Sequence, residues 1–168
     1  MKHQANKGER IAKIIARAGL ASRRESEKLI LDGRVKVNGK TINSPALNLT
    51  KNDVIEVDGK LLLPPEQTRL WIYNKPVGLV STSKDEKNRP TIFDNLPKEL
   101  PRVVSIGRLD LNSEGLLLLT NDGELKRRLE LPSTGWLRRY RVRVKGKLKD
   151  SMLEPLRHGI LVEGTHFK

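Results

Sequence analysis

The sequence predicts an α+β protein that has a small first domain and a larger second one. Residues 9–31 carry apolar side chains at helical spacing, and Val35 and Val37 alternate with charged residues as in a strand. Two prolines followed by polar residues interrupt the pattern at 64–68, which is typical of a stiff, exposed connector. We therefore expect domains at 8–63 and 69–168, joined by this linker.

The first domain opens with two short helices. Residues 9–18 are expected to form an amphipathic helix, which Gly19 ends. A second helix should begin after Ser22, because Glu25 lies three residues further on and completes a capping box. The apolar face of the first helix consists of Ile11, Ile14, Ile15 and Ala18.

A compact β unit follows the two helices. Val35 and Val37 alternate with charged residues, and Asn38-Gly39 suits a type I′ hairpin turn. A further strand is expected at residues 54–57, and Asp58-Gly59 forms another turn.

The second domain mixes strands and helices. Residues 115–120 are apolar almost throughout, so we expect this strand at the centre of a sheet. Residues 139–145 alternate basic side chains with Tyr140, Val142 and Val144, which predicts a half-exposed strand. Pro155 limits the last of the helices. Further strands are expected at 69–73 and 103–106, and helices at 124–130 and 150–157.

The composition narrows the classes of partner and of chemistry. The 168 residues carry a formal charge of +13, which favours a polyanionic partner, nucleic acid first and an acidic membrane surface second. There is no cysteine, so disulfides and thiol catalysis are excluded. The apolar run at 116–119 is far shorter than the roughly 20 residues of a membrane span. The first ten residues lack the apolar stretch of a signal peptide, so the cytoplasm is the expected compartment.

Several common catalytic motifs are missing. The sequence holds no GxxxxGK[ST], GxGxxG or GxSxG pattern. His3, His158 and His166 have no metal-ligand spacing, and we expect no metal site. Any catalysis must therefore rely on Asp, Glu, Tyr, Lys and Arg side chains.

Basic side chains gather on the first helix and at the start of the second. A solvated surface is one interpretation, although the helix start at Ser22 also favours a phosphate. The segments GLASRRE, GRVKVNGK and NDVIEV resemble the S4 RNA-binding domain. That resemblance implies RNA contacts for Arg10, Lys13, Arg17, Ser22, Arg23, Arg24 and Lys36.

The segment GRLDLNSEGLLLLTNDGEL, residues 107–125, contains the second notable group. In an extended backbone Arg108 and Asp110 point to the same side, and the arginine would help to keep the carboxylate ionised. Spacing alone also allows a plain connecting loop in which Asp110 caps a turn.

This segment resembles the signature of the RsuA family of RNA pseudouridine synthases. KPVGLVSTSKDEKNRPTIFDNLP and RRYRVRVKG match the family's other motifs. The resemblance implies a mixed, largely antiparallel catalytic sheet and no cofactor. It makes Asp110 the catalytic carboxylate, as nucleophile or base, and Tyr140 a ring that stacks on the uracil. Arg108 would pair with Asp110 or help to extrude the base.

The same resemblance gives further expectations. Family members continue for several dozen residues beyond this point, so we expect an incomplete, truncated catalytic domain. The substrate would be ribosomal RNA or a ribosome-assembly intermediate. The protein would act as a monomer and would have no membrane partner. NRPTIFD favours the RluB branch and hence 23S RNA, while 16S RNA and tRNA stay open. The alternative is a non-catalytic S4-type RNA-binding protein that acts in ribosome assembly.

Overall fold

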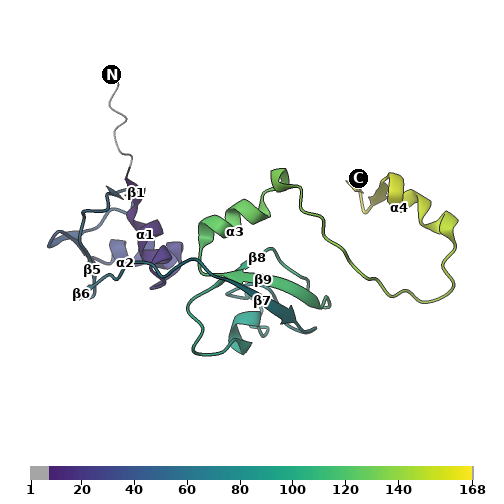
Figure 1. Ribbon diagram of the computed structural model, residues 1–168, viewed down its shortest axis with the longest axis horizontal. Coiled ribbons are helices and arrows are strands. Elements are labelled where there is room, and N and C mark those ends of the chain that lie inside the picture. The colour runs from purple at the N-terminus through teal and green to yellow at the C-terminus, as the bar shows by residue number, and fades with distance from the viewer. Residues whose placement is uncertain (1–7, 168) are drawn as a thin grey trace, which may run out of the picture. The chain divides into compact units, whose positions relative to one another are not determined.

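The computed structural model describes residues 8–167 of the chain. Of the histidines considered above, His3 lies outside this range. The chain divides into two compact units, Met1–Gly135 and Trp136–Lys168. Figure 1 colours the chain from the N-terminus in purple to the C-terminus in yellow.

The two predicted helices of the first domain are present as α1 (Ile11–Arg17) and α2 (Arg23–Leu31). The predicted capping box is confirmed, because the Ser22 hydroxyl accepts from the Glu25 amide and the Glu25 carboxylate accepts from the Ser22 amide. The first helix begins two residues later than predicted. The preceding residues instead form β1 (Glu9–Arg10), which pairs with β4 (Asn48–Leu49).

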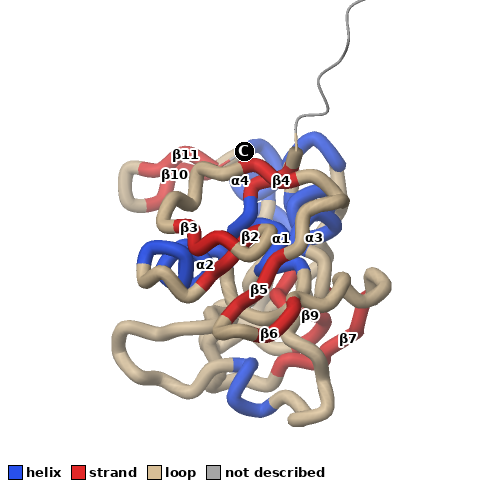
Figure 2. The backbone as a smooth tube through the Cα atoms, turned by 90° about the vertical axis from the view of Figure 1, so that its left-hand side faces the viewer, coloured by secondary structure: helices blue, strands red, loops and turns tan. Residues whose placement is uncertain are grey.

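The β unit of the first domain is a four-stranded antiparallel sheet. Its strands lie side by side in the order β3-β2-β5-β6 (Figure 2). Asn38 and Gly39 have φ angles of +49° and +79°, so the predicted left-handed hairpin turn is confirmed. The strands span Val35–Val37 (β2), Lys40–Ile42 (β3), Ile55–Val57 (β5) and Lys60–Leu61 (β6).

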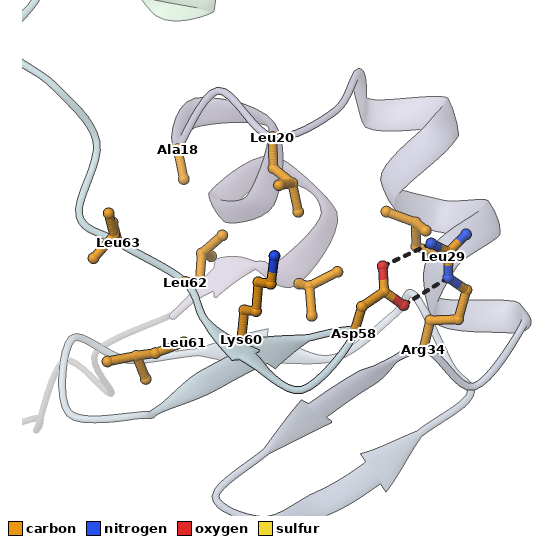
Figure 3. Close-up of a pocket in the computed structure, with 10 residues that line it drawn as sticks. Ala18, Leu20, Leu29, Arg34, Asp58, Lys60, Leu61, Leu62 and Leu63 are labelled. Carbon is orange, nitrogen blue, oxygen red and sulfur yellow. Dashed lines mark hydrogen bonds and ion pairs between the residues drawn. The ribbon is translucent and has the colours of Figure 1, made fainter.

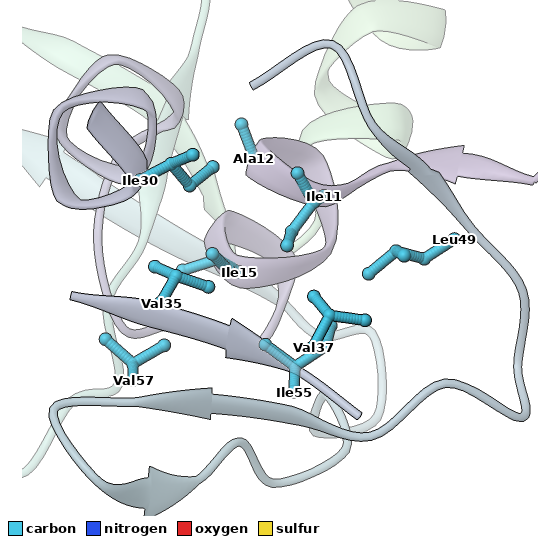
Figure 4. Packing of buried hydrophobic residues seen from close by; sticks show 9 residues of the cluster. All are labelled: Ile11, Ala12, Ile15, Ile30, Val35, Val37, Leu49, Ile55 and Val57. Carbon is cyan, nitrogen blue, oxygen red and sulfur yellow. The ribbon is translucent and has the colours of Figure 1, made fainter. Parts of the chain in front are cut away.

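One apolar core joins these helices to the sheet (Figure 4). Ile11 and Ile15 of α1 and Ile30 of α2 are completely buried against β2 and β5. The alternation of β2 sends Val35 and Val37 into the core and leaves the lysine between them exposed. The other buried members of the core are Ala12, Leu49, Ile55 and Val57.

A second sheet carries the remainder of the first unit. It consists of β7 (Leu70–Lys75), β9 (Gly115–Thr120) and β8 (Val104–Ile106), all antiparallel and in the order β7-β9-β8. The prediction of a central strand at 115–120 is therefore confirmed. After β9 the Asp122 carboxylate caps α3 (Gly123–Glu130), close to the expected helix.

The loops of this second sheet contain two short 3-10 helices. The first, η1 (Ile92–Asn95), lies between β7 and β8 and starts with a capping box made by Thr91 and Asp94. The second, η2 (Pro132–Thr134), follows α3. A second apolar core, whose buried members are Leu79, Ile92, Val103, Leu117 and Leu119, lies among these elements.

The second unit contains little regular structure. The predicted strand at 139–145 is wrong, because none of these residues belongs to a strand. A strand needs a hydrogen-bonded neighbour, and among residues 8–167 no strand pairs with this segment. The helix predicted at 150–157 is divided into η3 (Asp150–Met152) and α4 (Glu154–His158), with proline in the first turn of α4. A hairpin of β10 (Ile160–Val162) and β11 (Thr165–Phe167) follows.

Candidate active site and RNA-binding surface

The predicted catalytic residue lies on the loop that connects β8 to β9. Asp110 is exposed, whereas the neighbouring Leu109 packs against the second core. The Asp110 carbonyl accepts a hydrogen bond from the Ser113 amide at 3.0 Å, which closes a turn. The Gly78 amide also donates to the Leu111 carbonyl at 2.8 Å, so the loop is tied to the segment that follows β7. The Asp110 side chain is thus exposed to solvent, while hydrogen bonds fix the backbone of its loop.

A buried lysine, Lys75, makes hydrogen bonds to the backbone of this loop. Lys75, the last residue of β7, has no exposed surface. Its ammonium group donates to three backbone carbonyls, those of Pro76 and Asp110 at 3.0 Å and that of Ser113 at 2.8 Å. Burial lowers the pKa of Lys75, and the nearby charge of Asp110 opposes that shift. One side chain therefore joins the end of β7 to both ends of the turn formed by residues 110–113.

A buried serine makes the second connection. The Ser81 hydroxyl donates to the Leu109 carbonyl at 2.7 Å and accepts from the Leu109 amide at 3.1 Å. Ser81 itself is only 8% exposed. Both backbone groups of the residue before Asp110 are thereby satisfied by one side chain, which restricts the conformation from which the carboxylate projects.

Arg108 lies on the same loop as Asp110, and its charge acts on Glu130. No ion pair joins Arg108 to Asp110 among the described residues. Gly107 has a φ of +76°, so the backbone turns immediately before Arg108. Although burial opposes it, hydrogen bonds from Lys126 and the Gly107 amide lower the pKa of Glu130, and the charge of Arg108 adds to that effect. The two roles expected for Arg108, pairing with Asp110 or helping to extrude the base, stay predictions.

Tyr140 belongs to the second unit, whereas Asp110 belongs to the first. The tyrosine is 61% exposed and lies in a segment without helix or strand. Its role in the active site stays a prediction.

Most of the predicted RNA contacts are exposed basic side chains. Arg10, Arg17 and the pair Arg23 and Arg24 at the start of α2 are all exposed. Lys13 instead forms ion pairs with Glu9 and Glu124, and the hydrogen bond that its ammonium group donates to Glu124 is the main cause of its raised pKa.

Two other predicted contacts are in different surroundings. The Ser22 hydroxyl is engaged in its helix cap. Lys36 points away from the sheet face that packs on the helices, so the structure separates it from the arginines of α1 and α2.

A hollow of about 510 Å³ lies in the first domain (Figure 3). Its walls are mainly leucines, and the ion pair of Arg34 and Asp58 borders it, with an Nη2–Oδ2 distance of 2.6 Å. The described residues contain no group of three or more side chains able to hold a metal ion. No helix within residues 8–167 is long and apolar enough to cross a membrane.

Sequence reasoning missed Lys75 and Ser81. One signal for Lys75 was available: the period of two along β7 places it on the same face as Trp71 and Tyr73, which pack against the core. A lysine on the buried face of a strand needs acceptors, and the nearby turn supplies them. Ser81 carries no comparable signal, because its partner is 28 residues away in the sequence.

The chain thus combines an exposed carboxylate on a braced loop with a basic, two-helix region packed on its own sheet. Residues 9–55 match the S4 domain, and residues 69–164 match the family described as RNA pseudouridylate synthase. The chain belongs to this family of RNA-modifying isomerases.

Individual relatives agree with that assignment. An RNA pseudouridine synthase of Rickettsia felis is 54% identical over 159 residues, which cover 95% of this chain and 69% of that protein. The ribosomal large subunit pseudouridine synthase B of Pseudomonas aeruginosa is 45% identical over 161 residues, covering 93% of this chain and 42% of that protein. A crystal structure of a pseudouridylate synthase matches with a TM-score of 0.53 and 27% identity, over 94% of this chain and 68% of that one.

Proposed function

We propose that this chain isomerises uridine to pseudouridine in ribosomal RNA, with Asp110 as the catalytic carboxylate. The observation that carries the proposal is the exposed Asp110 carboxylate on a turn that Lys75 and Ser81 hold. A carboxylate so presented can attack a sugar carbon or remove a proton while its own backbone stays in place.

The reaction suits the available side chains. The N1–C1′ bond of uridine breaks, the uracil turns, and C5 joins the same sugar carbon, so that the C5 proton is lost and N1 regains one. No electrons are exchanged and no nucleotide is hydrolysed. The target uridine has to leave its helix at a cost of about a few kcal/mol. In this proposal Tyr140 stacks on the extruded uracil and Arg108 helps to extrude it.

The first domain would hold the substrate RNA by its backbone. Exposed Arg10 at the end of β1 and exposed Arg17, Arg23 and Arg24 on two packed helices offer several cations to phosphates. Because phosphate neutralisation makes affinity dependent on salt, replacing Arg23 and Arg24 by alanine should flatten the salt slope by roughly 1–2 units. An unchanged slope would move the RNA contacts elsewhere.

Large-subunit 23S RNA is the proposed substrate, and 16S RNA is the second choice. The relatives named ribosomal large subunit pseudouridine synthase B support this order. We place the activity in the cytoplasm, on rRNA or a ribosome-assembly intermediate, with the protein as a monomer.

The test is direct. The purified chain is incubated with transcribed fragments of 23S and 16S RNA, and pseudouridine is counted by mass spectrometry after nuclease digestion. The same measurement on rRNA from a strain that lacks the gene locates the target uridine. We expect one site to lose its pseudouridine in that strain. If both rRNAs keep all their pseudouridines and the chain modifies neither fragment, a non-catalytic RNA-binding role replaces this proposal.

A further inference from the structure

The segment after α3 carries the densest positive charge of the chain. Residues 138–149 hold seven basic side chains and no acidic one. Six of them recur at every second position and form what we call the cationic row: Arg139, Arg141, Arg143, Lys145, Lys147 and Lys149. Neither the catalytic loop nor the first domain accounts for this run of charge.

The structure leaves the cationic row free to meet a ligand. Every residue from 131 to 150 is exposed, and the backbone at 135–144 runs as an extended trace without helix or strand (Figure 1). Within the described part of the chain, no side-chain hydrogen bond or ion pair engages any of the six. The direction changes at Lys145 and Gly146, where the glycine has a φ of +100°.

An extended backbone turns this alternation into a regular ladder of charges. At a rise of about 3.3 Å per residue, the cations before the bend at Gly146, Arg139, Arg141 and Arg143, would stand roughly 6.6 Å apart on one side of the chain. That separation is close to the distance between successive phosphates in an extended single strand of RNA. Tyr140, 61% exposed, stands between two of these arginines in the sequence and offers a ring on which a base can stack.

We propose that the cationic row binds the phosphates of the single RNA strand that carries the target uridine. This inference rests on the proposed function, since it assigns the row to the RNA on which Asp110 acts. A membrane surface is the other polyanion to consider, because a polybasic segment is attracted to anionic lipids by charge alone. The exposed Tyr140 ring between the cations favours RNA, since a base can stack on it.

The test measures RNA affinity against salt for the 168-residue chain, with a fluorescein-labelled single strand of twelve uridines as the probe. The triple variant Arg139→Gln/Arg141→Gln/Arg143→Gln should lower the salt slope by about 2 units, since each single-strand phosphate contact contributes about 0.7. The control variant Lys51→Gln/Lys87→Gln/Lys98→Gln removes the same charge from exposed positions elsewhere. It should change the slope by less than about 0.5 unit.

Four results would overturn the assignment of the cationic row to RNA phosphates. Equal slopes for the two triple variants would mean that binding follows net charge alone. An unchanged slope for the arginine variant would place the strand elsewhere. If the arginine variant no longer binds vesicles of phosphatidylserine and phosphatidylcholine but keeps the salt slope of its RNA affinity, the segment binds a membrane. The variant Arg139→Lys/Arg141→Lys/Arg143→Lys keeps the charge and should keep the slope, so its failure would also count against a phosphate row.

The pseudouridine assay separates this inference from the proposed function. If the arginine variant keeps its salt slope while the unaltered chain still forms pseudouridine, only the row is wrong. If the variant loses its slope but no version of the chain forms pseudouridine, the row stands as an RNA-binding element and the proposed reaction falls.

Discussion

The loop that carries Asp110 and the segment that carries Tyr140 differ in how their backbones are held. The buried side chains of Lys75 and Ser81 make four hydrogen bonds with backbone groups of the Asp110 loop. The Tyr140 segment lies exposed and belongs to no helix or strand. A motif obtains its geometry from the residues that brace it, and only the first of these two is braced within residues 8–167.

The largest expected effect concerns the carboxylate itself. Asp110→Asn keeps the size of the side chain but removes the nucleophile or base, so pseudouridine formation should fall by at least about 10³-fold. RNA affinity should stay within about tenfold, because other residues supply the binding. Glu114→Gln removes an exposed carboxylate from the same loop and is the matched control. Appreciable turnover by Asp110→Asn would reject the assignment of Asp110.

The next effect tests the brace beneath the loop. Lys75→Met would leave the carbonyls of Pro76, Asp110 and Ser113 without their buried donor. We expect the free energy of unfolding to fall by about 2 kcal/mol, measured by urea denaturation. Lys98→Met at an exposed position should change it by less than about 0.5 kcal/mol. Equal values for the two variants would show that Lys75 does not brace the loop.

The same lysine gives a pH dependence with a definite sign. Burial lowers the pKa of Lys75 below its ordinary value of 10.5. At pH values between the lowered pKa and 10.5, the unfolded chain therefore binds more protons at this site than the folded chain does. Stability should therefore rise with pH between the lowered pKa and 10.5. Lys75→Met should lack this rise, and an identical pH profile for the variant would contradict the assignment.

A smaller loss is expected from the serine. Ser81→Ala removes both hydrogen bonds to Leu109, and unfolding should become easier by about 1 kcal/mol. Ser83→Ala, two residues along and exposed, is the control and should be close to neutral. If both variants unfold alike, the contacts to Leu109 do not hold the loop.

The smallest effect on stability should occur in the other region. Tyr140→Ala should change the free energy of unfolding by less than about 0.5 kcal/mol, because the ring is exposed. Tyr73→Ala, whose ring packs on the second core, should cost about 3 kcal/mol in the same assay. Pseudouridine formation should nevertheless fall in Tyr140→Ala, while Tyr140→Phe keeps the stacking ring. A large loss in Tyr140→Phe would implicate the hydroxyl group.

Local patterns were enough to predict the elements that form from neighbours in the sequence. The capping box at Ser22 and the hairpin turn at Asn38-Gly39 depend on residues only a few positions apart. The central position of β9 followed from its unbroken apolar run. The strand expected around Tyr140 failed for the opposite reason. Its alternation is genuine, but pairing depends on a partner strand that the segment's own residues do not specify.

The candidate site divides in the same way. The carboxylate of Asp110 was found from its motif, whereas its bracing by Lys75 and Ser81 joins residues 35 and 28 positions apart. Such contacts arise only once the sheet has formed. For Arg108, nearness to Asp110 in the sequence suggested an ion pair, and the described residues hold no such pair.

Hydrogen exchange of the 168-residue chain tests the central contrast most directly. Peptides that cover 105–120 should contain amides that exchange at least about 100-fold more slowly than unstructured chain, as expected for backbone groups held in a folded loop and sheet. Peptides that cover 136–149 should exchange within about tenfold of the unstructured rate, because no helix or strand includes them. Equal protection of the two regions would contradict the account, since the Tyr140 segment would then be held as firmly as the Asp110 loop.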